Sequence, residues 1–315
     1  MAPRIKRIIG SGMVIVARQK ICYKDYIAKG LRKSKSMVLP QFLVKKTPKQ
    51  ENIRKIRALL NDHCLHSVCE SAKCPNIGEC FERNTMTFMI LGNVCTRHCR
   101  FCGIEKGQPL PVDENEPQKV AEAVAKLGLS YVVITSVTRD DLQDGGASHF
   151  ASTILAVSRQ PLATRIEVLI PDFQGNEDAL KTVLSANPYV LNHNIETIPR
   201  LYSKIRPEAS YAQSLKLLER SKQLRPDIYS KSGFMLGLGE EKAEVIAVIK
   251  DLKKVNCDLV TIGQYLPPSR NHLPAERYVA PEEFAEYQDI GQSLGIKIFA
   301  GPFVRSSYRA GEISQ

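Results

Sequence analysis

The segment TFMILGNVCTRHCRFC, residues 87–102, joins a short apolar run to three closely spaced cysteines. An apolar run of this length is typical of a buried β-strand. Similar runs recur at residues 131–137, 165–170, 189–194, 233–238 and 259–266. Amphipathic stretches separate them, for example residues 116–128, in which Val120, Val124 and Leu127 recur at helical spacing. Strands that alternate with helices predict βαβ units and a parallel sheet.

Such a sheet is either open and doubly wound or closed into a barrel, and a last run at residues 297–304 is expected to add an edge strand. In both architectures the chemistry gathers at the carboxyl ends of the strands. The three cysteines directly follow the first predicted strand. We therefore expect them at the functional end of the sheet.

The charge of the chain is concentrated at its beginning. The chain has 315 residues, 43% of them hydrophobic, and a formal net charge of +11. Residues 1–36 hold ten Lys or Arg and one acid, so this tail alone carries +9 and the rest only +2. The tail could bind an anionic partner or be a leader or an organelle transit peptide, and translation could also begin at Met13 or Met37. No apolar run approaches the roughly 18 to 20 residues of a membrane helix.

The cysteines indicate metal binding. Seven of the nine lie between Cys64 and Cys102, in a chain large enough to need no disulfides. Reduced thiolates bound to metal fit better, and they imply a reducing compartment, most simply the cytoplasm. Cys95, Cys99 and Cys102 have no fourth cysteine nearby, and a 4Fe-4S cluster held by three thiolates keeps one iron open for another ligand. A zinc site completed by His98 is the alternative.

The motif CTRHCRFC resembles the signature of the radical S-adenosylmethionine (SAM) enzymes. The resemblance implies that Cys95, Cys99 and Cys102 hold a 4Fe-4S cluster whose open iron binds SAM. It also implies that Phe101 lies near the adenine of SAM. Reductive cleavage of SAM would then yield a 5'-deoxyadenosyl radical that abstracts hydrogen from unactivated carbon.

Two further motifs, CESAKCPNIGEC (residues 69–80) and FVRSSYRAGE (residues 303–312), resemble the lipoyl synthase family. The resemblance extends from about residue 39 to Tyr308. It implies an auxiliary 4Fe-4S cluster held by a second ligand set: Cys69, Cys74, Cys80 and Ser307. Ser306 is the alternative serine ligand, and Arg305 and Tyr308 are expected to brace the serine.

The same resemblance implies sulfur insertion at C6 and C8 of an octanoyl chain on a lysine of a lipoyl carrier domain, with the auxiliary cluster as sulfur donor. The expected partners are octanoylated E2 subunits of 2-oxoacid dehydrogenases and the glycine cleavage H protein, a ferredoxin or flavodoxin as reductant, and an iron-sulfur carrier. Neither nucleic acid nor membrane is expected. Family members contact cofactor or substrate at strand ends, which here carry Thr135, Ser136, Asn194 and Glu196; capping and turn formation are the alternative roles.

The resulting fold prediction is a partial (β/α)6 barrel of the TIM type with N- and C-terminal extensions. Its expected divisions are a basic tail (1–36), an N-terminal extension (37–86), the radical SAM barrel (87–296) and a C-terminal extension (297–315). The competing functions are a two-cluster methylthiotransferase acting on RNA and a non-enzymatic, metal-stabilised binding protein. An RNA-modifying enzyme would usually need an appended RNA-binding domain, and stacking aromatics interleaved with Lys and Arg do not stand out.

Overall fold

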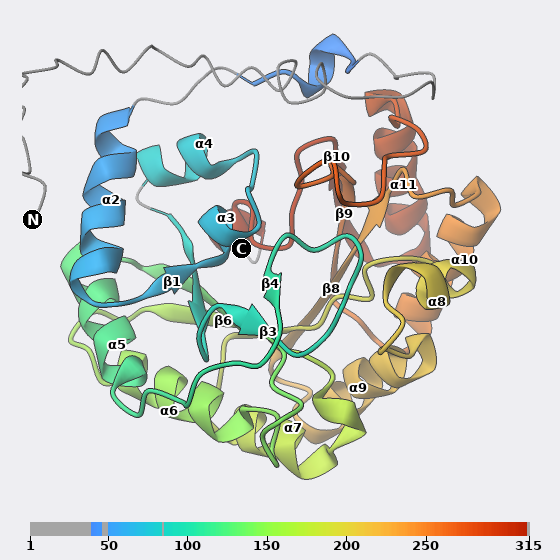
Figure 1. The fold of residues 1–315 in the computed structure, drawn as a ribbon. Helices are drawn as coiled ribbons and strands as arrows, with labels where there is room; N and C mark the ends of the chain where they lie inside the picture. Colours follow the sequence, from blue (N-terminus) through green and yellow to red (C-terminus); the bar gives the residue numbers. More distant parts are fainter. Residues whose placement is uncertain (1–38, 46–49, 84, 314–315) are drawn as a thin grey trace, which may run out of the picture.

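The computed structural model describes residues 39–45, 50–83 and 85–313; the basic tail of residues 1–36 lies outside them. An eight-stranded sheet forms the centre of this part (Figure 1), in the order β1-β2-β5-β6-β7-β8-β9-β10. The strands are β1 (His66–Ser67), β2 (Thr87–Ile90), β5 (Tyr131–Ser136), β6 (Arg165–Leu169), β7 (Val190–Asn192), β8 (Tyr229–Leu236), β9 (Leu259–Gln264) and β10 (Lys297–Gly301). Strand β1 is antiparallel to β2, and all other neighbours in the sheet are parallel.

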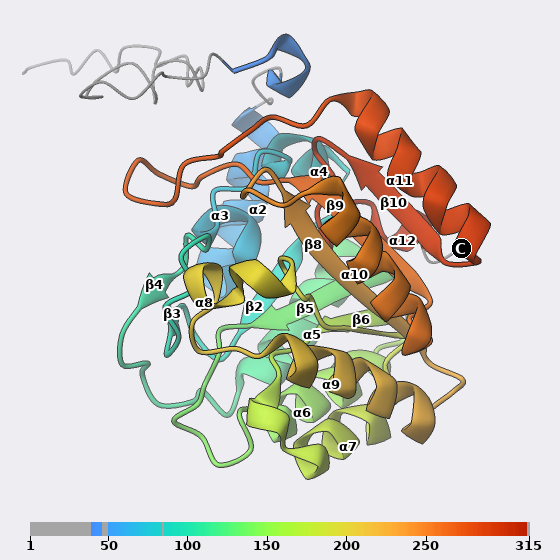
Figure 2. The ribbon, with the colours of Figure 1, turned by 90° about the vertical axis from the view of Figure 1, so that its right-hand side faces the viewer.

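Helices cover the outer face of the curved sheet (Figures 1 and 2). The long ones that follow the strands are α5 (Glu116–Leu127), α6 (Ala147–Ser158), α7 (Glu177–Ser185), α9 (Tyr211–Leu224), α10 (Lys242–Lys254) and α11 (Pro281–Leu294). Short elements occupy the loops: η2 (Phe173–Gly175), η3 (Pro199–Leu201), α8 (Tyr202–Ile205), and the parallel pair β3 (Val94–Cys95) and β4 (Glu105–Lys106). The end strands β1 and β10 do not pair with each other, so the barrel is open.

The predicted partial barrel is confirmed. Each of the six predicted strands is present, and the expected edge strand forms as β10, which pairs with β9. Strand β8 begins at Tyr229, four residues before the apolar run that predicted it. Helix α5 ends where expected, because Gly128 takes the left-handed conformation (φ 62°) that closes a helix. In the described residues no helix has both the length and the apolar character needed to cross a bilayer.

The N-terminal extension covers one end of the barrel. It comprises η1 (Gln41–Leu43), α2 (Gln50–Asp62), β1, α3 (Val68–Ser71) and α4 (Ile77–Glu82). Beyond β10, the chain turns back and ends in α12 (Ala310–Ile313), which contacts β5. This last segment lies directly on two glycines: a Cβ at Gly263 would stand 2.1 Å from the Val304 carbonyl oxygen, and one at Gly233 would stand 3.0 Å from Ser306 Oγ. Bare glycine backbone therefore lets the C-terminal segment enter the barrel.

The interior of the barrel contains a buried ion pair between β6 and β8. Lys231 Nζ lies 2.9 and 3.1 Å from the two carboxylate oxygens of Glu167, and both side chains are fully buried. Asn192 Nδ2 and the Tyr131 hydroxyl donate to the same carboxylate at 2.9 and 2.7 Å. Side chains alternate along a strand, so Glu167 points inward like its neighbours Arg165 and Leu169, which line the cavity described below. The polar network thus compensates the charges inside the barrel.

Candidate functional site

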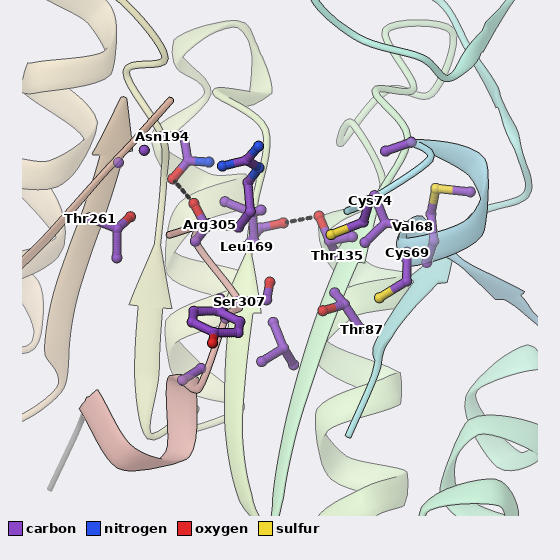
Figure 3. Close-up of a pocket in the computed structure, with 18 of the residues that line it drawn as sticks. Val68, Cys69, Cys74, Thr87, Thr135, Leu169, Asn194, Thr261, Arg305 and Ser307 are labelled. Atoms are coloured by element: carbon purple, nitrogen blue, oxygen red, sulfur yellow. Dashed lines mark hydrogen bonds between the residues drawn. The ribbon is translucent and has the colours of Figure 1, made fainter. Parts of the chain in front are cut away.

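A cavity of about 670 Å³ lies inside the barrel and is lined by strand ends and by both terminal extensions. Figure 3 shows Cys69 and Cys74 from the N-terminal extension and Ser307 from the C-terminal segment facing this space. All of the predicted ligand and cofactor residues line it: Cys69, Cys74, Cys80, Cys95, Cys99, Phe101, Cys102, Thr135, Ser136, Asn194, Glu196 and Ser307. The fold therefore brings together side chains that are up to 238 positions apart in the sequence, from Cys69 to Ser307.

The loop after β2 presents Cys95, Cys99 and Cys102. The backbone N–H of Thr138 donates to Cys95 Sγ at 3.3 Å, which is the kind of contact that supports a cluster thiolate. Lys106 Nζ donates to the Cys102 carbonyl at 2.5 Å, and His272 Nε2 lies 3.1 Å from the same oxygen. Lys106, from the same loop, and His272, from the segment after β9, thus converge on the Cys102 carbonyl.

Arg97, inside this loop, attaches it to the sheet. Its guanidinium lies 2.6 Å from Asp140 Oδ2 and 2.7 Å from Asp172 Oδ1, and it is almost fully buried. Because Asp140 and Asp172 follow β5 and β6, this one side chain connects three strand ends. Planar guanidinium groups suit such bidentate contacts with two carboxylates. Arg97 therefore ties the cysteine loop to the segments that follow β5 and β6.

The second cysteine set comes from α3, α4 and the turn between them. Ser67 caps α3 by accepting from the backbone N–H of Cys69 at 3.2 Å, which fixes the start of this short helix. Burial and, to a smaller extent, the nearby Cys74 thiol raise the pKa of Cys69 to about 11. Burial and the thiols of Cys69 and Cys74 raise the pKa of Cys80 to about 12. The three sulfur atoms are thus close enough to affect one another.

In the downstream set, two of the three thiols also have raised pKa values. Burial raises the pKa of Cys102 to about 11, and burial also raises the pKa of Cys99, although the positive charge of Arg206 opposes that shift. In both sets the other thiols add to the rise. The raised pKa values keep Cys69, Cys80 and Cys102 protonated near pH 7 in the metal-free chain, so their ionisation must be coupled to the binding of a cation.

Both donor sets fit an iron-sulfur cluster better than a single ion. In the part of the chain that the structure describes, no three His, Cys, Asp or Glu side chains converge as the ligands of one metal ion do. A 4Fe-4S cluster binds each thiolate through a different iron, so its ligands surround a volume instead of a point. Two sets of three soft thiols that line one cavity suit such clusters. The zinc alternative with His98 is not favoured, because the His98 ring is exposed, lies 3.0 Å from Glu208 and does not line the cavity.

The two serines of the RSSY motif have different surroundings. The Ser306 hydroxyl donates to Asn194 Oδ1 at 2.7 Å (Figure 3). The Ser307 hydroxyl has no hydrogen-bond partner among the described residues, and it faces the cavity that the cysteines line. Ser307 is therefore the serine whose oxygen is available to a ligand, which supports its choice over Ser306.

Tyr308 ties the C-terminal segment to the N-terminal extension. Its hydroxyl donates to Glu79 Oε1 at 2.7 Å, and Arg309 and Lys45 donate to the same carboxylate at 3.0 Å each. Burial alone would raise the pKa of Glu79, but the hydrogen bonds from Tyr308, Lys45 and Arg309 outweigh burial and lower it to about 2. Arg305, by contrast, donates to the carbonyl of its neighbour Val304 at 2.7 Å.

A polar wall beyond β7 carries Asn194, Glu196 and Arg206. Asn194 Nδ2 donates to Glu196 Oε1 at 3.0 Å, and Arg206 Nη1 donates to the Asn194 carbonyl at 3.0 Å. Glu196 has a left-handed backbone (φ 63°) and bridges to Phe234 of β8, which turns its carboxylate toward the cavity. Burial raises the pKa of Glu196, while Arg206 opposes this rise. A buried carboxylate beside a buried cation suits contact with a zwitterionic ligand.

Thr135 and Ser136 lie at the end of β5. As with the two serines, one hydroxyl has a hydrogen-bond partner and the other has none among the described residues. The Thr135 hydroxyl donates to the Leu169 carbonyl at 2.9 Å, so it supports the β5–β6 edge. Ser136 Oγ is buried in the cavity wall without a partner among the described residues. Phe101 packs against the apolar cluster around β8 and β9 while still lining the cavity. Of these three, Ser136 is the side chain with an unused hydrogen-bonding atom.

Sequence reasoning missed Arg97, Arg206 and Glu79. Arg97 and its partner Asp140 are 43 positions apart, and Glu79 and Tyr308 are 229 apart. No local pattern connects such pairs. The only available signal was that Arg97 lies between two predicted ligands and Glu79 directly precedes a third.

Comparison with known proteins agrees with this geometry. The family model of the radical SAM superfamily matches residues 89–252. The chain is 58% identical over 261 residues to the lipoyl synthase of Caldanaerobacter subterraneus subsp. tengcongensis, and the match covers 82% of this chain and 92% of that protein. The chain belongs to the lipoyl synthase family. A second member, from Caldicellulosiruptor saccharolyticus, is 52% identical over 277 residues, which cover 88% of this chain and 97% of that protein.

Solved structures support the fold. The crystal structure of methylornithine synthase matches with a TM-score of 0.51 over 82% of this chain and 80% of that chain, at 13% sequence identity. At this identity the likeness concerns the fold alone. Membership of the lipoyl synthase family makes the chain a radical SAM enzyme with SAM and 4Fe-4S clusters as cofactors, so the predicted family and enzyme class are confirmed.

Proposed function

We propose that the chain inserts two sulfur atoms, at C6 and C8, into an octanoyl group carried on a lysine of a lipoyl carrier domain. The observation that carries this proposal is that two separate sets of three thiols line one cavity, which the Ser307 hydroxyl also faces. One set alone would suffice for radical formation. A second set with a serine suits a cluster that gives up its sulfur, because an oxygen ligand is harder and weaker toward iron than a thiolate.

In this proposal each cysteine set has its own task. Cys95, Cys99 and Cys102 would hold the cluster that binds SAM, and the upstream cysteines with Ser307 would hold the auxiliary cluster. When bound, these groups supply an electron, a hydrogen-abstracting radical and sulfide. The chain's own contribution is to keep the two groups on different walls of one cavity, so that an acyl chain between them is exposed to both.

The polar wall of the cavity is suited to the SAM methionine group. The buried carboxylate of Glu196 can accept hydrogen bonds from an ammonium, and Arg206 can pair with a carboxylate; Arg206 Nε has no partner among the described residues. Ser136 Oγ offers another unused donor and acceptor at the same strand ends. Phe101 provides an apolar surface for the adenine.

Apolar side chains of the cavity suit the octanoyl chain. Met89, Val133 and Leu169 line it together with the two cysteine sets, and water is excluded from such an apolar surface. Exclusion of water protects a carbon radical from side reactions. We further propose that residues 37–86 and 297–315 act as extensions that complete the auxiliary site, and that residues 87–296 form the radical SAM barrel.

Lipoyl carrier proteins are the partners that the family implies, and we propose octanoylated E2 domains and glycine cleavage H protein as substrates. A ferredoxin or flavodoxin would reduce the clusters, and an iron-sulfur carrier would rebuild the auxiliary one. Because the cysteines must remain reduced, we propose a reducing compartment such as the cytoplasm.

The test is anaerobic reconstitution with iron and sulfide, followed by incubation with SAM, reductant and an octanoyl-lysyl peptide. About eight irons per chain and a peptide that has gained two sulfur atoms support the proposal. About four irons and release of 5'-deoxyadenosine without sulfur in the peptide would overturn it, because radical formation would then work without a sulfur-donating site.

A further inference from the structure

The carboxylate of Glu79 joins the two chain segments that carry the proposed auxiliary ligands. Glu79 lies on α4, one position before Cys80, and its partner Tyr308 lies one position after Ser307. Tyr308 Oη and Arg309 Nη2 donate to Oε1 at 2.7 and 3.0 Å, and Lys45 Nζ donates to Oε2 at 3.0 Å. Two segments separated by more than 200 residues thus converge on one side chain.

A second connection lies on the other side of Ser307. The buried Asn76 donates from Nδ2 to the Phe303 carbonyl at 2.7 Å, and its Oδ1 accepts from Lys45 Nζ at 2.6 Å. The Lys45 ammonium also lies 4.6 Å from the centre of the Phe303 ring and 5.3 Å from that of Tyr308. The C-terminal segment is therefore attached to the N-terminal extension both before and after the serine pair.

These attachments leave Ser307 little freedom except at its hydroxyl. Ser306 is bound to Asn194, and Tyr308 is bound to Glu79, so the residues on both sides of Ser307 have fixed partners. Short bonds to neighbours on either side define where a side chain points, and the one hydroxyl of the pair that has no partner among the described residues lines the same cavity as the upstream cysteines.

We infer that Glu79 is a positioning residue that sets the Ser307 hydroxyl in register with Cys80 at the auxiliary site. The inference rests on the proposed function, because it gives Ser307 the role of a cluster ligand. Glu79 acts through Tyr308 and Arg309 and does not itself touch the cluster. Its loss is expected to weaken the auxiliary site while leaving the site of Cys95, Cys99 and Cys102 intact.

The chain offers a matched control in a second ion pair between the same two segments. Arg83 Nη1 lies 2.8 Å from Glu312 Oε1, and both side chains are about half exposed. Exposed pairs of this kind contribute little. Arg83→Ala is therefore expected to be silent, and it shows whether the loss of one contact between these segments is by itself enough to release iron.

The experiment measures iron held by the upstream set alone, in full-length chains in which Cys95, Cys99 and Cys102 are all replaced by alanine. A chelator removes the iron, and the rate of loss is followed by absorbance. We expect Glu79→Ala to lose iron at least about tenfold faster than the parent, since a hydrogen bond to a charged group is removed. The rate of iron loss from Glu79→Gln should lie between those of the parent and Glu79→Ala, because the Gln amide oxygen still accepts from Tyr308. The rate for Arg83→Ala should stay within about twofold of the parent rate.

A double-variant cycle separates positioning from general stabilisation. If Glu79 acts through Ser307, Glu79→Ala adds nothing to the rate of iron loss in a Ser307→Ala chain. Additive effects, or equal effects of Glu79→Ala and Arg83→Ala, would overturn the inference. A parent chain that holds no iron at the upstream set would overturn it as well, together with the proposed function.

Hydrogen exchange of the metal-free chain gives a readout that needs no cluster and also checks folding. Glu79→Ala should speed the exchange of the Tyr308 amide, whose N–H is bonded to the Arg305 carbonyl at 3.0 Å, and leave the barrel strands as protected as in wild type. Unchanged exchange at Tyr308 would contradict the inference. A wild-type chain that releases 5'-deoxyadenosine but transfers no sulfur would instead refute the proposed function alone, because the exchange and iron-loss results do not depend on turnover.

Discussion

A single methyl group added at Gly263 would test how closely the C-terminal segment must fit the sheet. The new Cβ would stand 2.1 Å from the Val304 carbonyl oxygen, whereas ordinary contact begins at 3.4 Å. Relief of the clash needs a displacement of about 1.3 Å, and because the opposing atom belongs to the backbone, no side-chain rotation can supply it. The segment that carries Ser307 must move.

The size of the effect follows from that displacement. Overpacking of this kind typically costs about 1–3 kcal/mol of unfolding free energy. A shift of this size also exceeds what the 2.7 Å hydrogen bond between Ser306 and Asn194 can absorb, so Ser307 would be displaced in the cavity that the cysteines line. We expect Gly263→Ala to retain 5'-deoxyadenosine release but to lose most of its sulfur insertion.

The assay combines urea unfolding, iron content after reconstitution and mass spectrometry of an octanoyl-lysyl peptide. Gly301→Ala is the matched control, because its Cβ would meet only a methyl group of the Val304 side chain, at 3.3 Å, and that group can rotate; a change below about 0.5 kcal/mol is expected. The reasoning is refuted if Gly263→Ala unfolds like wild type and inserts sulfur at the wild-type rate, or if Gly301→Ala is impaired to the same degree.

Other predictions concern the serine pair, the buried ion pair and a buried histidine. Ser307→Ala should abolish sulfur insertion with 5'-deoxyadenosine release retained, whereas Ser306→Ala should retain part of the insertion, as peptide mass spectrometry will show; equal losses would contradict the assignment. Lys231→Met should lower the unfolding free energy by about 3–5 kcal/mol in urea titrations, because it removes the cationic partner of the buried Glu167 carboxylate, and a loss below about 1 kcal/mol would argue against a buried pair. His193 is neutral when folded, since burial and the charge of Arg206 lower its pKa from 6.5 to about 4. Unfolding therefore takes up a proton in this window, so stability should decline as the pH falls from about 6.5 toward 4, by at most about 1.4 kcal/mol per pH unit, and a His193→Gln chain should show a smaller slope.

The barrel could be read from the sequence, and the candidate cysteine ligands could be predicted from it, because both depend on local signals. Apolar runs such as residues 131–137 specify strands, and amphipathic runs such as residues 116–128 specify helices. The spacings of the two cysteine motifs are short enough to be recognised in the sequence itself. The beginning of β8 at Tyr229 was missed because its first residues, Tyr-Ser-Lys-Ser, are polar, and they form a strand only through pairing with β7 and β9.

The choice between the two serines depended on the tertiary structure. Ser306 and Ser307 are adjacent and chemically identical, so no pattern distinguishes them. Only the fold shows that one hydroxyl is bound to Asn194, 112 positions away, and that the other faces the cavity. The same applies to Thr135 and Ser136, of which the first is used by the Leu169 carbonyl and the second is left without a partner among the described residues.

The sequence by itself therefore determined the family, the alternation of strands and helices, and the two cysteine motifs that predict ligand sets, because these depend on residue types at short spacings. The tertiary structure decided how the sets share one cavity, which serine is free, and that Glu79 joins the segments of Cys80 and Ser307. Those features depend on contacts across as many as 229 positions, between Glu79 and Tyr308. The bare backbone of Gly233 and Gly263 lets the C-terminal segment enter the barrel and reach the N-terminal extension.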